Sequence, residues 1–221
     1  MIEDERYDEQ RRQLVRQEVA TVMGLRTSAF FAYLLIALAM LSVAVGAAIA
    51  AFRSTPADSV MLFIATTMTM VGVVAAVGAV LSTRGLHRDP LDALQLTRPK
   101  KTRAPRNMPA GVSVLVVAIL VGILLAFLLL SESIAMASGV LVGFVFLGLI
   151  GPASAACFQW SERDLDSQLA EDPALRERVD STVPIWVHDA LTDRALERRR
   201  NEARKERFAK RIDPPADTSE P

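Results

Sequence analysis

The sequence predicts an all-α polytopic membrane protein with four transmembrane helices, arranged as two hairpins, and with helical N- and C-terminal extensions. Three observations predict this fold. Hydrophobic residues make up 51% of the chain although 23% of it is charged, so the two kinds of residue must be segregated. Four long runs contain no charged residue. The basic residues lie almost entirely in alternate segments between these runs.

The four apolar runs cover residues 28–52, 59–81, 109–130 and 134–158. Each is longer than the roughly 20 residues that a helix needs to cross the hydrocarbon core. A helix in a soluble core would show a polar stripe at every third or fourth position, and these runs show none. The first run is too long for the apolar part of a leader peptide and follows a mostly polar segment, so we expect a retained span.

The distribution of basic residues predicts the orientation. Every Lys and Arg except Arg53 lies in residues 1–27, 82–108 or 159–212. The positive-inside rule therefore places both termini and the middle linker in the cytoplasm. The strong excess of Arg over Lys, with abundant Ala and Val, is typical of a GC-rich bacterial genome. We expect a multi-pass protein of a bacterial plasma membrane, with the lipid bilayer as its first partner and only short turns on the outer side.

The segments outside the spans are predicted to be partly helical. Residues 1–27 form a cytoplasmic amphipathic helix that runs into the first span or lies beside it, because apolar residues recur at helical spacing. Residues 82–108 form a basic linker whose prolines permit only a short helical turn around 91–96.

The cytoplasmic tail, residues 159–212, is predicted to be helical. Asp172 followed by Pro173 is a typical helix start. Pro184 ends that helix and opens another, from about 185 to 212. Residues 213–221 are proline-rich, without an apolar cluster, and are expected to be disordered.

Small residues recur at packing distance in the fourth span. Ala135, Gly139 and Gly143 follow one another at i+4 spacing, and Gly151 is expected further along the same face. Such a stripe lets another helix backbone come close. The favoured interpretation is packing within one four-helix bundle, and the alternative is self-association or docking to a larger membrane complex.

A basic cluster lies near the C-terminal end of the tail. It is predicted to contact anionic lipid headgroups or a protein partner, at roughly 1 kcal/mol per basic group near the membrane surface. A solvated helix that only satisfies the positive-inside bias is the simpler alternative, and nucleic acid is less favoured because Phe208 is the one aromatic residue there. The cluster consists of Arg198, Arg199, Arg200, Arg204, Lys205, Arg207, Lys210 and Arg211.

Catalytic chemistry is not indicated. The four runs contain no Asp, Glu, Lys, Arg or His, whereas proton-coupled transport and intramembrane hydrolysis usually need such a group. Cys157 is the single cysteine, expected to be a small buried side chain. His87 and His188 are far apart in the sequence, and no phosphate-binding loop or metalloprotease motif is present. We therefore expect no metal, cofactor or enzymatic activity.

The favoured function is that of a non-enzymatic scaffold or accessory subunit of a membrane complex, which acts through its cytoplasmic helices. One alternative is a small oligomeric pore or transporter with Thr66, Thr67 and Thr69 along its path. Another is a membrane-bound enzyme with an active site on the cytoplasmic surface.

Overall fold

The computed structural model describes residues 2–53, 58–87, 89, 91, 104–184, 186–189 and 191–192, and the regular secondary structure of these residues is entirely helical. Four helices are long and apolar enough to cross a membrane, as the sequence predicts. The helices are α1 (Ile2–Arg53), α2 (Ser59–Leu86), α4 (Met108–Leu129), α5 (Ile134–Glu171) and the short α6 (Pro173–Ser181).

Local capping explains where three of the helices begin. The Asp58 carboxylate accepts hydrogen bonds from the backbone amides of Val60 and Met61, at 2.9 and 3.4 Å, at the start of α2. The Ser133 hydroxyl caps α5 in the same way. α6 begins at the predicted position, with Asp172 as its cap. These side chains satisfy amide groups that would otherwise lack partners at a helix start.

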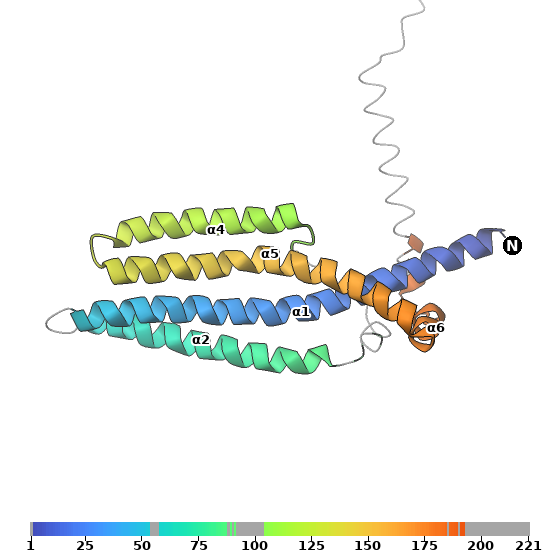
Figure 1. The fold of residues 1–221 in the computed structure, drawn as a ribbon, viewed down its shortest axis with the longest axis horizontal. Helices are drawn as coiled ribbons and strands as arrows, with labels where there is room; N and C mark the ends of the chain where they lie inside the picture. The colour runs from blue at the N-terminus through green and yellow to red at the C-terminus, as the bar shows by residue number, and fades with distance from the viewer. Residues whose placement is uncertain are drawn as a thin grey trace, which may run out of the picture.

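The four long helices form an open layer in the order α2, α1, α5, α4 (Figure 1). α1 packs against α2 and α5, whereas α4 packs mainly against α5. Within the most apolar window of each helix, 6% of α4 is buried inside the protein, against 39% of α5. The helices that the sequence predicts to pack within one bundle thus form a layer with many exposed apolar side chains, an arrangement that suits helices surrounded by lipid.

The two central helices, α1 and α5, touch through their backbones. A methyl group added at Gly139 would lie 2.7 Å from the carbonyl oxygen of Ser42 and 3.0 Å from the Cα of Gly46. Gly143 faces the same helix, since a methyl group there would lie 3.1 Å from the carbonyl oxygen of Ala39. The Ala135 carbonyl oxygen would lie 2.7 Å from a methyl group added at Gly46. Three of the four small residues singled out in the sequence thus meet α1.

Gly151 does not share this face, so that part of the expectation is wrong. A methyl group added at Gly151 would lie 2.5 Å from the carbonyl oxygen of Gly111 in α4. The physical reason is the helical repeat: a side chain four residues further along points about 40° away from the first. Gly151 follows Gly139 by three such steps, so the two positions point about 120° apart. α5 therefore presents glycines to α1 on one side and to α4 on another, which favours a layer.

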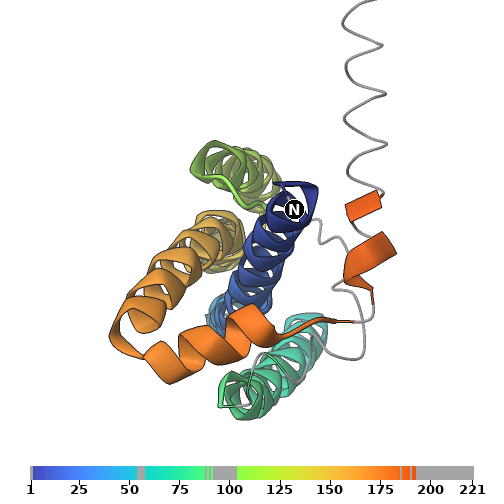
Figure 2. The same ribbon diagram turned by 90° about the vertical axis from the view of Figure 1, so that its right-hand side faces the viewer.

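Beyond the apolar runs, α1 and α5 continue in the same direction past the other helices, and α6 turns back across them (Figure 2). The N-terminal segment is therefore one helix with the first span. We call this end the polar module. It consists of residues 2–27 of α1, residues 159–171 of α5, α6, Leu91 and the described residues between 186 and 192.

The contact of α1 with α5 leads to a first prediction. Gly139→Ala should lower the free energy of unfolding by about 1–3 kcal/mol, because the added methyl meets backbone atoms that move only if the helices separate. Gly85→Ala in α2 is the control, since nothing lies within 4 Å of a methyl group there. Thermal unfolding in detergent micelles measures both variants. Equal stability of the two variants would contradict the role of this contact.

Candidate functional site

The polar module has a hydrophobic core of its own. α1 contributes Leu14, Val15 and Val19, each only 1% exposed. α5 contributes Leu165 and Leu169 to the same cluster. The apolar face of the amphipathic N-terminal segment is therefore covered by protein.

The rest of this core comes from distant parts of the chain. Val179 belongs to α6, and Trp186 and Val187 follow it. Leu91 comes from the segment between α2 and α4 and is 3% exposed. The core thus brings together residues that precede the first apolar run, residues that lie between the second and third runs, and residues that follow the fourth run.

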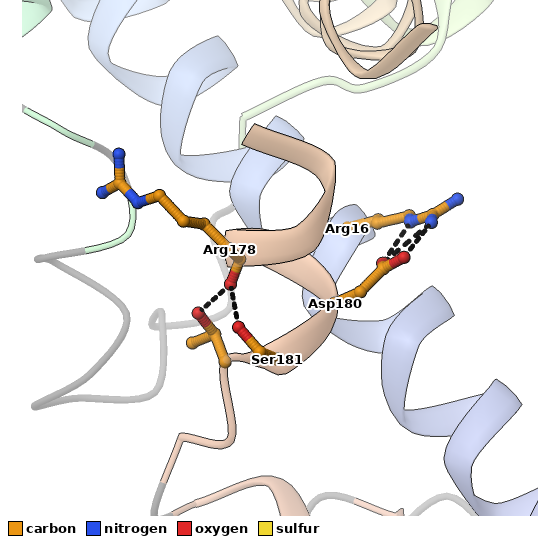
Figure 3. Close-up of polar contacts among 5 residues, drawn as sticks. Arg16, Arg178, Asp180 and Ser181 are labelled. Carbon is orange, nitrogen blue, oxygen red and sulfur yellow. Dashed lines mark hydrogen bonds and ion pairs between the residues drawn. The ribbon is translucent and has the colours of Figure 1, made fainter. Parts of the chain in front are cut away.

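An ion pair fastens α6 to α1. The Arg16 guanidinium donates from Nε to Asp180 Oδ1 at 3.1 Å and from Nη2 to both carboxylate oxygens at 2.8 and 2.9 Å (Figure 3). The two side chains are 34% and 21% exposed. Charged, forked hydrogen bonds of this kind fix orientation as well as distance. Figure 3 also shows the Ser181 hydroxyl donating to the Arg178 carbonyl at the end of α6.

A second ion pair connects α6 with the segment after α2. Arg178 Nη2 donates to Asp89 Oδ2 at 2.6 Å, and Asp89 Oδ1 accepts the backbone amide of Leu91 at 2.9 Å. The Leu91 amide lowers the pKa of Asp89 most, and the charges of Arg178 and Arg26 lower it further. Asp89 therefore stays ionised at neutral pH, and it holds Leu91 in place at the edge of the core.

Aromatic and small residues tie the module to the spans. A methyl group added at Gly24 would lie 2.6 Å from Cδ1 of Phe158. The Phe158 ring can therefore occupy this position only because residue 24 has no side chain. The Arg106 guanidinium lies 5.6 Å from the centroid of the Phe158 ring, within cation–π distance. The hydroxyl oxygens of Ser28 and Ser154 are buried and 3.4 Å apart. The junction between layer and module is therefore closely packed.

A cavity of about 630 Å³ opens between the module and the ends of the spans. This volume is within the usual range for ligand pockets. α1, α5, α6 and the end of α2 line it, with Met23, Leu86 and Leu175 among the apolar residues. Its polar lining consists of Arg26, Thr27, His87, Asp89, Asp164 and Gln168.

The depth of the cavity follows from the sequence positions of its lining. Arg26 and Thr27 directly precede the first apolar run. His87 follows the last residue of α2, and Trp160 lies two residues beyond the fourth run. Trp160 is 57% exposed, as expected for an indole at the boundary between hydrocarbon and water. The cavity therefore lies beyond the ends of the apolar runs, where the polar module begins.

The histidines and the cysteine occupy separate places. His188 Nδ1 lies 3.4 Å from the Tyr7 hydroxyl, whereas His87 lines the cavity. Cys157 is a buried free thiol in α5, as expected. In the part of the chain that the structure describes, no three His, Cys, Asp or Glu side chains are grouped so as to hold a metal ion.

The three threonines of α2 donate within their own helix. Thr66, Thr67 and Thr69 each hydrogen-bond a carbonyl four residues earlier, at 2.8 Å. The basic cluster at 198–211 and most of the predicted helix at 185–212 lie outside the described residues.

Sequence reasoning missed both the cavity and the extent of the module core. One signal was present: Trp160, Asp164 and Gln168 recur every four residues on α5 and so share one face. Arg26 at the start of the first span was a second signal. Neither pattern indicated that α2 and α6 would close the other walls.

Comparison with known proteins supplies no family. The chain matches no family model, no curated protein and no solved structure.

The Arg16–Asp180 pair leads to a second prediction. Asp180→Asn should destabilise the protein by about 1–2 kcal/mol, because it leaves a partly buried guanidinium with a neutral partner. Hydrogen exchange should rise in α6 more than in the spans. The matched control is Asp166→Asn, which removes the same charge from an exposed position of α5. If both variants exchange alike, the pair does not hold α6.

Proposed function

We propose that the chain is a non-enzymatic multi-pass protein of a bacterial plasma membrane, built as two transmembrane hairpins with both termini in the cytoplasm. The distribution of basic residues supports this orientation, since Arg53 alone lies between the first and second runs. The capped, short connection from Leu129 to Ser133 supports the second hairpin: the Leu129 carbonyl accepts the amides of Glu132 and Ser133.

We further propose that the protein is a scaffold or accessory subunit, which holds the polar module at the inner membrane surface for a larger membrane complex. One observation carries this proposal: the module core combines Leu14, Leu91 and Leu165, which the apolar runs separate in the sequence. The module can form its core only when the helices around it are in place. It is a rigid platform that depends on insertion into the membrane.

The continuity of the helices supports the same proposal. α1 and α5 each pass from the apolar layer into the module without interruption. A partner that docks on the module would therefore be fixed relative to the membrane, and a partner within the bilayer would be coupled to it. The Arg16–Asp180 pair keeps α6 in a defined position on this platform.

The basic cluster adds a role for anionic lipid. It would lie close to the inner leaflet if the tail follows the orientation proposed above. Attraction to anionic headgroups would then hold the tail against the membrane and leave the module exposed to partners. The eight basic side chains are Arg198, Arg199, Arg200, Arg204, Lys205, Arg207, Lys210 and Arg211.

Topology is tested by cysteine labelling in a Cys157→Ala background. A membrane-impermeant maleimide added to intact cells should label Ser54→Cys and leave Thr102→Cys unlabelled, because the first turn faces outward and the middle linker faces the cytoplasm. Permeabilised cells are the control, in which both variants should react. Labelling of Thr102→Cys alone in intact cells would invert the topology and remove the proposal.

The scaffold role is tested by purification in mild detergent. The wild-type chain should run larger than a monomer and retain a partner. Val15→Asp should lose that partner, because an unpaired carboxylate in the core opens the module. Gln13→Asp is the matched control, since it adds the same charge on the exposed side of α1 and should retain the partner. A wild-type chain that runs alone as a monomer, or a Val15→Asp variant that keeps the partner, would contradict the role.

A further inference from the structure

The α5 wall of the cavity carries three polar or aromatic side chains in one row. Trp160, Asp164 and Gln168 follow one another every four residues and all line the cavity, so they share one face of the helix. Apolar side chains line other walls, among them Met23 on α1 and Leu175 on α6. The cavity therefore combines an indole, a carboxylate and an amide with apolar surface.

The other charged groups at the cavity are already engaged. The Asp89 carboxylate is paired with Arg178 at 2.6 Å. The charge of Arg26 also acts on Asp89, and Arg26 has an interaction of its own. A ligand would therefore have to compete with existing contacts in order to use any of these three groups.

Asp164 is in a different situation. Its side chain is partly buried, and Oδ2 accepts a hydrogen bond from Gln168 Nε2 at 2.8 Å. Among the described residues this neutral amide is its one side-chain partner, and a neutral donor leaves the negative charge of the carboxylate in place. The amide oxygen of Gln168 takes no part in that bond and is a further acceptor beside the carboxylate.

We propose that this cavity binds a small organic ammonium ion with an apolar body. The ammonium group lies beside the Asp164 carboxylate and the Trp160 indole, where both the charge and the ring face attract it. The Gln168 amide oxygen accepts one of its protons. The apolar body lies against Met23 and Leu175.

The lining disfavours other classes of ligand. A divalent metal ion needs more ligands than one carboxylate and one amide supply, and no three His, Cys, Asp or Glu side chains are grouped for a metal in the described part of the chain. An anion would be repelled by Asp164. A neutral apolar molecule would cover the Asp164 carboxylate without matching its charge, which is costly.

The test uses three nitroxide probes that share one apolar ring. Amino-TEMPO is protonated at neutral pH, hydroxy-TEMPO is neutral and carboxy-TEMPO is negative. Electron paramagnetic resonance measures the immobilised fraction of each probe with the full-length protein in non-ionic detergent micelles. Amino-TEMPO should bind about tenfold more tightly than hydroxy-TEMPO, as expected for one charged hydrogen bond, and carboxy-TEMPO more weakly than either. Equal binding of amino-TEMPO and hydroxy-TEMPO would overturn the proposal.

Variants locate the ammonium group. Asp164→Asn should abolish the preference for amino-TEMPO over hydroxy-TEMPO, whereas Asp164→Glu keeps the carboxylate and should keep the preference. Asp166→Asn is the matched control, because it removes the same charge from an exposed position of α5 outside the cavity lining, and it should bind as the wild type. If Asp164→Asn and Asp166→Asn show the same preference, Asp164 does not hold the ammonium group.

Competition separates a small amine from a lysine side chain of another protein, which has the same charged group. Cyclohexylammonium should displace amino-TEMPO at about a tenfold lower concentration than methylammonium, because its ring buries more apolar surface. Acetyl-lysine amide, which carries polar peptide groups, should compete no better than methylammonium. Equal competition by all three amines would overturn the role of the apolar body, and stronger competition by acetyl-lysine amide would assign the site to a protein partner.

The ammonium site does not depend on the scaffold role. Loss of a copurifying partner would leave probe binding unchanged, and an absence of probe binding would leave partner capture unchanged. The two proposals are therefore judged by separate measurements.

Discussion

The backbone contact between α1 and α5 is the interaction on which the rest of the structure depends. Gly46 and Gly139 let the two helices meet without side chains between them. α2 then packs on the free side of α1, and α4 packs on the free side of α5. The same two helices continue beyond the apolar runs and bring Leu14 near Leu165. One close contact in the layer therefore sets the geometry of the polar module.

An open layer of apolar helices is stable when lipid surrounds it, although the same arrangement would be unstable in water. Hydrocarbon surrounds apolar side chains as well as protein does, so α4 needs little burial. Close packing inside the layer occurs at helix contacts such as Gly46 with Gly139 and Gly111 with Gly151. Further close contacts lie at the ends of the apolar runs, at Gly24, Phe158 and the buried serine pair. The ion pairs of α6 and the cavity of about 630 Å³ lie beyond the ends of the apolar runs, where the proposed function is also located.

Several features were predictable because they depend on nearby residues. The spans follow from the free energy of transfer of each apolar run into lipid. The starts of α2 and α6 follow from Asp58 and Asp172, whose carboxylates cap amides two and three residues ahead. The face of Gly151 was mispredicted, because i+4 spacing approximates a straight stripe only over one or two helical turns. The chosen small residues still mark helix contacts, but with two different neighbours.

The sequence by itself determined that four helices are long and apolar enough to cross a membrane and where α2 and α6 begin, because hydropathy and capping act over short stretches of chain. The sequence did not indicate, however, that the residues lining the cavity lie close together in the fold. Arg26 lies on α1, His87 directly follows α2, and Asp164 lies on α5. Their meeting depends on how far α1 and α5 slide and rotate against each other at their glycine contact, and on the turn that brings α6 back over α1. Only the tertiary structure decided these, since no local pattern records the register between distant helices.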